Sequence, residues 1–228
     1  MHSEQQIQEE ASAIISFSDS YTQNKERKLN EQQDSESISS LTDITSPLDS
    51  LSYRIQYIHT CKQVIQIPKF LQSITALSLY KVGSHLREEI DLLRLKVRSL
   101  SRRCLFWIQD QGDEQVQSEL INNGYGRLMA FTLSTAGGQG EEQDKEIFYG
   151  LDYIYHFLRD LYEGRNNEWQ TSLQPLPLLV QLTEEQIEEE GANEEIEAQM
   201  NNNGYYGNIM TQANRVKAET LNRFIYKY

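Results

Sequence analysis

The sequence predicts an all-α protein, a right-handed solenoid of about three helical repeats behind a disordered N-terminal tail. Three observations predict this class. Apolar residues recur every three or four positions in three long stretches. Two shorter helical stretches, joined at a glycine or a proline, precede each long one. Only four prolines occur among 228 residues, which is typical of a mostly helical chain.

Residues 1–46 are expected to form a disordered acidic tail rich in serine and glutamine. The segment has nine acidic residues against three basic ones, and its apolar residues are too scattered to offset the entropy lost on ordering. The Ser46–Pro47 step then indicates a turn at a domain boundary, or alternatively a phosphorylation site. The repeat domain is expected to occupy residues 48–228.

The three long helices are expected over residues 90–109, over residues 144–162, and from Ile209 to the C-terminus. Helical spacing places one apolar face on each of them. In the first two helices this face consists of Leu93, Val97, Leu100, Cys104 and Ile108, and of Ile147, Leu151, Ile154, Leu158 and Leu161. In the third it consists of Ile209, Ala213, Val216, Thr220 and Phe224.

The paired short helices are expected within residues 57–73, 116–134 and 178–200, each pair bent at a sharp corner. Pro68, Gly124 and Gly191 lie at these corners, where a fixed φ or a left-handed cap ends one helix and starts the next. The corner positions 67, 124 and 191 are farther apart than the roughly 40 to 47 residues of armadillo or HEAT repeats. Insertions with loop composition explain the excess, over residues 74–89, 136–143 and 164–177.

The composition excludes several classes of function. A net charge of −13 argues against binding to nucleic acids or anionic membranes. No apolar run reaches the length of a membrane span, and the N-terminus lacks the features of a signal peptide. Two cysteines and four histidines form no zinc pattern, and no nucleotide-binding or hydrolase motif is present. We therefore expect a protein without enzymatic activity, cofactor or metal, whose partner is another protein.

Residues 57–228 resemble the C-terminal armadillo repeats of importin-α, the adaptor that carries cargo proteins into the nucleus. IEEEGANEEIEAQMNNN and QANRVKAETLNRFIYKY resemble the terminal repeat of that family, and ELINNGYGRLMAFTLS with IFYGLDYIYHFLRDL resembles the penultimate one. The resemblance implies a protein-binding adaptor in nuclear transport, present in the nucleus and the cytoplasm. Its partner would be a nuclear transport receptor or a cargo peptide.

The resemblance also implies a binding groove along the long helices. Importin-α holds its ligand with a tryptophan and an asparagine four residues apart on the inner face of each long helix. The corresponding positions here are Arg103 and Trp107 in the first long helix and Asp152 and His156 in the second. These four residues are the candidates for the inner groove.

Two other interpretations of the chain stay open. LQSITALSLYKVGSHLR followed by KVRSLSRRCLFWI resembles the N-terminal helical module of transcription elongation factor S-II. The chain could instead be a structural subunit of a larger complex.

Two charged segments also permit two interpretations each. The basic residues between positions 87 and 103 form either a docking strip for an acidic partner or a solvated helix face. The eight glutamates between positions 184 and 197 form either a binding site for basic peptides or a second solvated face.

Overall fold

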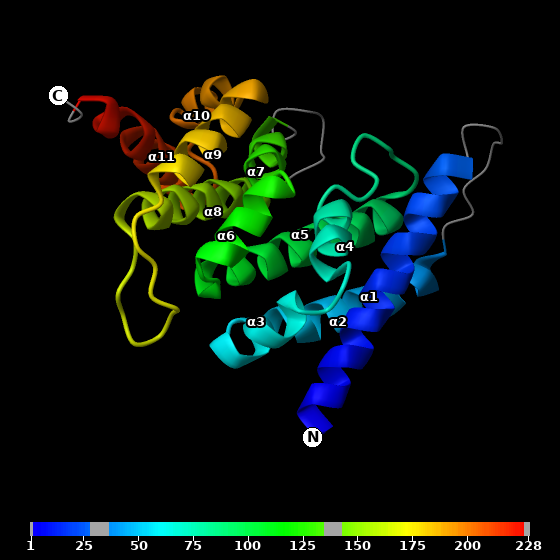
Figure 1. Ribbon diagram of the computed structural model, residues 1–228. Coiled ribbons are helices and arrows are strands. Elements are labelled where there is room, and N and C mark those ends of the chain that lie inside the picture. Colours follow the sequence, from blue (N-terminus) through cyan, green and yellow to red (C-terminus); the bar gives the residue numbers. More distant parts are fainter. Residues whose placement is uncertain (1, 28–36, 135–142, 226–228) are drawn as a thin grey trace. The chain divides into compact units, whose positions relative to one another are not determined.

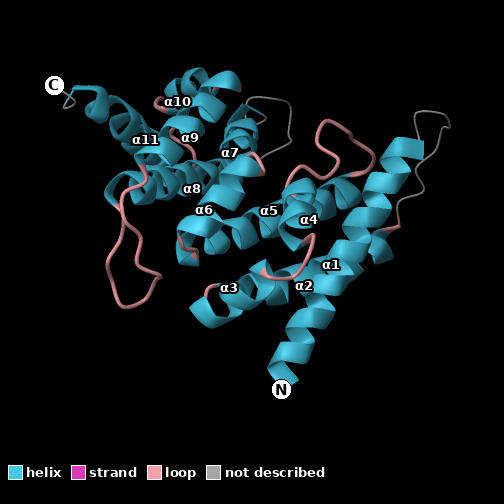
Figure 2. Ribbon diagram, viewed as in Figure 1, coloured by secondary structure: helices cyan, strands magenta, loops and turns pink. Residues whose placement is uncertain are grey.

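The protein is mostly helical in the computed structural model, which describes residues 2–27, 37–134 and 143–225. These residues form eleven α-helices and one short 3-10 helix, and no β-strand occurs among them (Figures 1 and 2). The all-α prediction is therefore confirmed. The chain divides into two compact units, unit 1 (Met1–Gly112) and unit 2 (Asp113–Tyr228). The division falls inside the stretch expected to form one domain.

Unit 1 is built around the contact between two of its helices. Its five helices are α1 (His2–Arg27), α2 (Ile38–Ile55), α3 (Ile58–Ile65), α4 (Phe70–Leu77) and α5 (Glu88–Gln111) (Figure 1). Helix α5 packs most extensively on α2, and α1 packs on α2 and α4. The fully buried side chains of this core include Leu41, Leu48, Leu51, Phe70, Ile74, Leu105 and Ile108.

The disordered tail expected over residues 1–46 is wrong for the part of it that the structure describes. Residues 2–27 form helix α1, and α2 begins at Ile38 and runs through Pro47 without a boundary. Ile7, Ala11 and Ile14 bury one narrow stripe of α1 in unit 1. The spacing of this stripe is helical, but polar residues outnumber apolar ones in α1 and hide the stripe in the average composition. Residues 28–36 lie outside the described residues.

Unit 2 contains two short pairs of helices, each followed by a long helix. Its elements are α6 (Glu114–Asn122), α7 (Tyr125–Ser134), α8 (Asp144–Glu163), α9 (Pro177–Glu189), α10 (Ala192–Gln199), the 3-10 helix η2 (Tyr205–Gly207) and α11 (Asn208–Ile225). The long helices α8 and α11 pack on each other, and α7 packs on α8, α9 and α10. Tyr125 of α7 meets Phe157 of α8 edge to face, with ring centroids 4.9 Å apart, inside this core.

The three predicted corners are present and have left-handed backbone. Gly124 between α6 and α7 has a φ of +76°, and Gly191 between α9 and α10 has a φ of +68°. At the first corner the left-handed residue is Lys69, with a φ of +65°, and not the preceding Pro68. Glycine adopts this conformation without steric cost, whereas lysine does not. The apolar faces predicted for the long helices are also buried, except that Leu93 and Thr220 are only partly so and the side chain of Phe224 lies outside the description.

Candidate functional site

The first predicted pair of site residues lies on the partly exposed face of α5 in unit 1. Arg103 reaches across to α2, where its Nη2 donates to Asp49 Oδ1 at 2.6 Å and its Nε donates to Ser52 Oγ at 2.9 Å. Trp107, one turn further along α5, stacks at a tilt against Phe106, with ring centroids 5.0 Å apart. Both predicted residues remain partly accessible to solvent. They can therefore contact a ligand that lies along α5.

Two exposed tyrosines extend this face, one on α2 and one just before α3. Tyr53 follows Asp49 by one helical turn, and it meets Tyr57 edge to face with ring centroids 6.4 Å apart. Both rings are exposed large hydrophobic groups. Tyrosine and tryptophan supply large contact areas at low entropic cost and are enriched in interface hot spots. The surface formed by Asp49, Tyr53, Arg103 and Trp107 is called the α2–α5 face below.

The second predicted pair lies on α8 in unit 2. His156 Nε2 is 3.6 Å from Asp152 Oδ1, and the same carboxylate oxygen accepts a hydrogen bond from Gln212 Nε2 of α11 at 2.9 Å. Burial raises the pKa of the Asp152 carboxyl, while the positive charges of His156, Arg215 and Arg159 act in the opposite direction. The surface around Asp152 and His156 is called the α8–α11 face below.

The structure thus brings the predicted residues together in two pairs. Arg103 and Trp107 share the α2–α5 face, and Asp152 and His156 share the α8–α11 face. The two pairs belong to different compact units. On each face an aromatic or imidazole ring lies beside charged groups that can form hydrogen bonds. This combination suits the recognition of a peptide backbone and its side chains.

The basic stretch of α5 has a role that neither sequence interpretation anticipated. Arg94, Arg98 and Arg102 are buried, and they follow each other at steps of four residues. Each donates to a main-chain carbonyl of the connector between α4 and α5. The acceptors are Ser84 O at 2.8 Å, Tyr80 O at 3.2 Å and Ser78 O at 3.2 Å, respectively. For these three arginines, both the docking strip and the solvated face are wrong.

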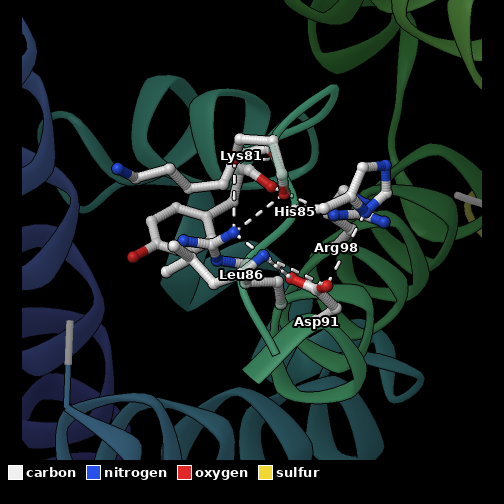
Figure 3. Close-up of polar contacts among 8 residues, drawn as sticks. Lys81, His85, Leu86, Asp91 and Arg98 are labelled. Atoms are coloured by element: carbon white, nitrogen blue, oxygen red, sulfur yellow. Dashed lines mark hydrogen bonds and ion pairs between the residues drawn. The ribbon is translucent and has the colours of Figure 1, made fainter. Parts of the chain in front are cut away.

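Asp91 completes this arrangement at the start of α5. Its carboxylate accepts a hydrogen bond from the main-chain N–H of Leu86 at 3.3 Å and lies 3.6 Å from His85 Nδ1 (Figure 3). Arg94 Nη1 also lies 3.3 Å from Asp91 Oδ1. The connector is therefore fixed to α5 by side chains of α5 itself. The four-residue spacing of the arginines, directly beside the apolar face, was the one signal in the sequence that could have indicated this.

A cavity of about 500 Å³ opens between α1, α2 and α3 of unit 1. Its walls are formed by Glu4, Ile7, Arg54, Tyr57, His59, Thr60 and Gln63. Gln63 Nε2 donates to Glu4 Oε1 at 3.3 Å and lies 3.3 Å from His59 Nε2. These polar groups interact with one another across the opening. Throughout the described ranges, no group of three His, Cys, Asp or Glu side chains could hold a metal ion.

Comparisons with known proteins were made by family model, by sequence and by structure, and none gave a match. A separate search of the described helices found none long and apolar enough to cross a membrane.

Proposed function

We propose that the protein is a binding adaptor built on armadillo-like repeats and that its ligand is an extended peptide segment of another protein. The succession of helices carries this proposal. Two short helices and one long helix follow each other three times, as α3–α4–α5, α6–α7–α8 and α9–α10–α11. The long helices have 24, 20 and 18 residues, and a left-handed residue separates the short helices of each triplet.

The packing within unit 2 supports stacking of successive repeats. The third helices of two triplets, α8 and α11, pack on each other, and so do the second helices, α7 and α10. Repeat proteins bury a continuous core by this kind of contact between equivalent helices of neighbouring units. Their exposed long helices then form an extended surface for ligands. In this proposal, the α2–α5 face of unit 1 and the α8–α11 face of unit 2 each provide a surface of this kind.

The chemistry of the two faces favours a ligand of mixed character. Arg103 is paired with Asp49 at an exposed site, where an ion pair contributes about 1 kcal/mol or less, so its guanidinium can exchange Asp49 for a ligand carboxylate. Trp107 offers a stacking surface beside it. On the other face, Asp152 can accept from a ligand amide or ammonium group. Arg103 would repel a lysine or arginine at its position, so a purely basic peptide fits poorly there.

Nuclear transport is the process that the resemblance to importin-α suggests. We propose that the partner is a transport receptor or a cargo protein and that the chain is found in the nucleus and the cytoplasm. Imaging of the tagged full chain in cells tests this part. Exclusion of the protein from the nucleus, with and without inhibition of nuclear export, would refute a role in transport and leave peptide binding intact.

Selection from a random peptide library displayed on phage tests the binding function. Selected peptides should bind the wild-type chain, and Trp107→Ala or Asp152→Ala should each weaken part of the selected set by about tenfold. Trp169→Ala is the matched control, because Trp169 is exposed but lies outside both faces. If no peptide is selected, or if Trp107→Ala, Asp152→Ala and Trp169→Ala have equal effects, these faces do not bind peptides.

A further inference from the structure

Helix α9 leaves an apolar pair uncovered on its outward side. The helix buries Val180, Thr183 and Ile187, while Leu178 is 77% exposed and Leu182 is 45% exposed. These two leucines are four residues apart and therefore neighbours on one side of the helix. An isolated exposed leucine is ordinary on protein surfaces, but two on one helix face form a contact area for another apolar surface.

The position of α9 is fixed by Gln186, which lies four residues after Leu182, on the flank between the exposed and the buried sides of the helix. Gln186 Nε2 donates to the carbonyl of Ile121 at 2.9 Å, and Gln186 Oε1 accepts from the main-chain N–H of Gly126 at 3.2 Å. The side-chain amide of Gln186 therefore anchors α9 to α6 through its nitrogen and to α7 through its oxygen, and this fixes the orientation of the exposed leucines. A rigid, preformed surface loses little entropy when a partner docks on it.

Carboxylates continue the same face toward the C-terminal end of α9. Glu185 and Glu188 are exposed, and no basic side chain of the described residues pairs with either one. Glu189 is the contrast, because Arg127 Nε donates to its Oε2 at 3.2 Å. The last turn of α9 has no basic residue, although the C-terminal end of a helix favours positive charge. The carboxylates of Glu185 and Glu188 therefore repel the partial negative charge at the C-terminal end of α9. A cationic partner would reduce this repulsion.

We propose that this outward side of α9, the α9 face, docks a basic amphipathic segment of another protein. Apolar side chains of that segment cover Leu178 and Leu182, and its lysines or arginines reach Glu185 and Glu188. The charge of this chain argues against the other occupants. A net charge of −13 opposes docking of a second copy, of nucleic acid or of an anionic membrane. The α9 face is separate from the α2–α5 and α8–α11 faces, so the two proposals stand independently.

Binding of a designed peptide to the full-length protein tests this inference. The probe is a fluorescein-labelled helical peptide of about 18 residues with leucines on one side and lysines on the other, measured by fluorescence anisotropy. The leucine–lysine peptide should bind saturably, and the Leu178→Ser/Leu182→Ser variant should lose about tenfold in affinity. Glu185→Gln/Glu188→Gln should weaken binding and reduce its dependence on salt. A peptide with glutamate in place of lysine should not bind.

Controls distinguish docking from simple charge attraction. Leu86→Ser changes a leucine of unit 1 that is 53% exposed, between the values of Leu182 and Leu178, so it should leave the affinity unchanged. Wild-type affinity in the Leu178→Ser/Leu182→Ser variant would overturn the proposal, because binding would then be electrostatic only. A version of the probe with a photoreactive leucine should cross-link within residues 177–189. Cross-links confined to any other segment would equally overturn it, whatever the folding of the variants.

Discussion

Replacing Asp160 by Asn should destabilise unit 2, because it leaves the buried positive charge of Arg165 without its ion-pair partner. Arg165 Nη1 lies 2.8 Å from Asp160 Oδ2, and the two side chains are only 4% and 3% exposed. Arg165 Nε also donates to the carbonyl of Thr171 at 2.9 Å, and the main chain of Arg165 exchanges two hydrogen bonds with Leu173. The pair therefore holds the loop between α8 and α9 against the end of α8.

The loss in free energy of unfolding depends on which buried charge remains in each variant. Breaking a buried ion pair costs about 3–5 kcal/mol, because the remaining charge stays in a poorly solvated site. Asn keeps the shape of Asp160 and still accepts a hydrogen bond, so we expect the lower end, about 3 kcal/mol. Arg165→Met should cost less, about 2 kcal/mol, because Arg159 Nη2 remains 3.3 Å from the Asp160 carboxylate. The double variant should cost less than the two single changes together, since no buried charge is left without its partner.

Urea unfolding measured by far-UV circular dichroism provides the assay, because loss of α8 and its neighbours removes helical signal. Asp43→Asn, an exposed change in unit 1, is the control and should not move the transition. The reasoning is refuted if Asp160→Asn changes the free energy of unfolding by less than about 1 kcal/mol, the range of an exposed ion pair. Strict additivity of the two single changes would refute it as well.

Four further outcomes concern single side chains. Ile14→Ala should destabilise unit 1 by about 2–4 kcal/mol in urea, because a fully buried side chain leaves a cavity, whereas the exposed control Ser12→Ala should have no effect. Equal urea midpoints for Ile14→Ala and Ser12→Ala would favour a disordered N-terminal segment. Gly124→Ala should cost about 1–2 kcal/mol in thermal unfolding because the φ of Gly124 is +76°, whereas nothing lies within 4 Å of an added Cβ. Gly124→Asn should cost less, because asparagine adopts the left-handed conformation more readily than alanine. A larger loss of stability in Gly124→Asn than in Gly124→Ala would show that the left-handed backbone is not the cause. Burial raises the pKa of the Cys104 thiol to about 12, so iodoacetamide should modify Cys104 only in urea, as followed by peptide mass spectrometry. Rapid modification of the folded protein would disprove its burial. Burial also raises the pKa of the Asp152 carboxyl, so the folded state favours the protonated form and loses stability as the pH rises through the titration of that carboxyl. Asp152→Asn should therefore be more stable than wild type at neutral pH and equal to it in acid, and the opposite order in urea melts would refute the sign.

The long helices were predictable because their signal is local. The apolar face of residues 144–162 repeats over five turns, and the structure has a helix over Asp144–Glu163 with that face buried. Gly124 and Gly191 marked corners for a similar reason, because the left-handed backbone restricts the residue type at a single position. Arg103 and Trp107 lie off the apolar face of their helix, and they are partly exposed as the spacing predicts.

The N-terminal segment shows where local reasoning failed. Among the described side chains of α1, the buried apolar ones are Ile7, Ala11 and Ile14, with Glu10 and Ser18 buried beside them. This apolar stripe is too small for the helix to be stable alone. Tyr80, from the distant connector after α4, also packs on this helix, with its ring centroid 4.7 Å from that of Tyr21. Contacts of this kind are absent from the composition of residues 1–46. The helix exists because the rest of unit 1 gives its stripe a surface to cover.

The sequence by itself determined that the chain is helical, where the three long helices after residue 57 lie, and where sharp corners interrupt that part of the chain. The tertiary structure alone decided which polar side chains are buried. Arg98 and Arg102 look like surface residues in the sequence, yet they are buried against main-chain carbonyls some 18 and 24 positions away. Periodicity reports only the average preference of a side chain for water. A buried charge is stable only where partners from another segment replace that water, and the position of those partners is a property of the folded chain.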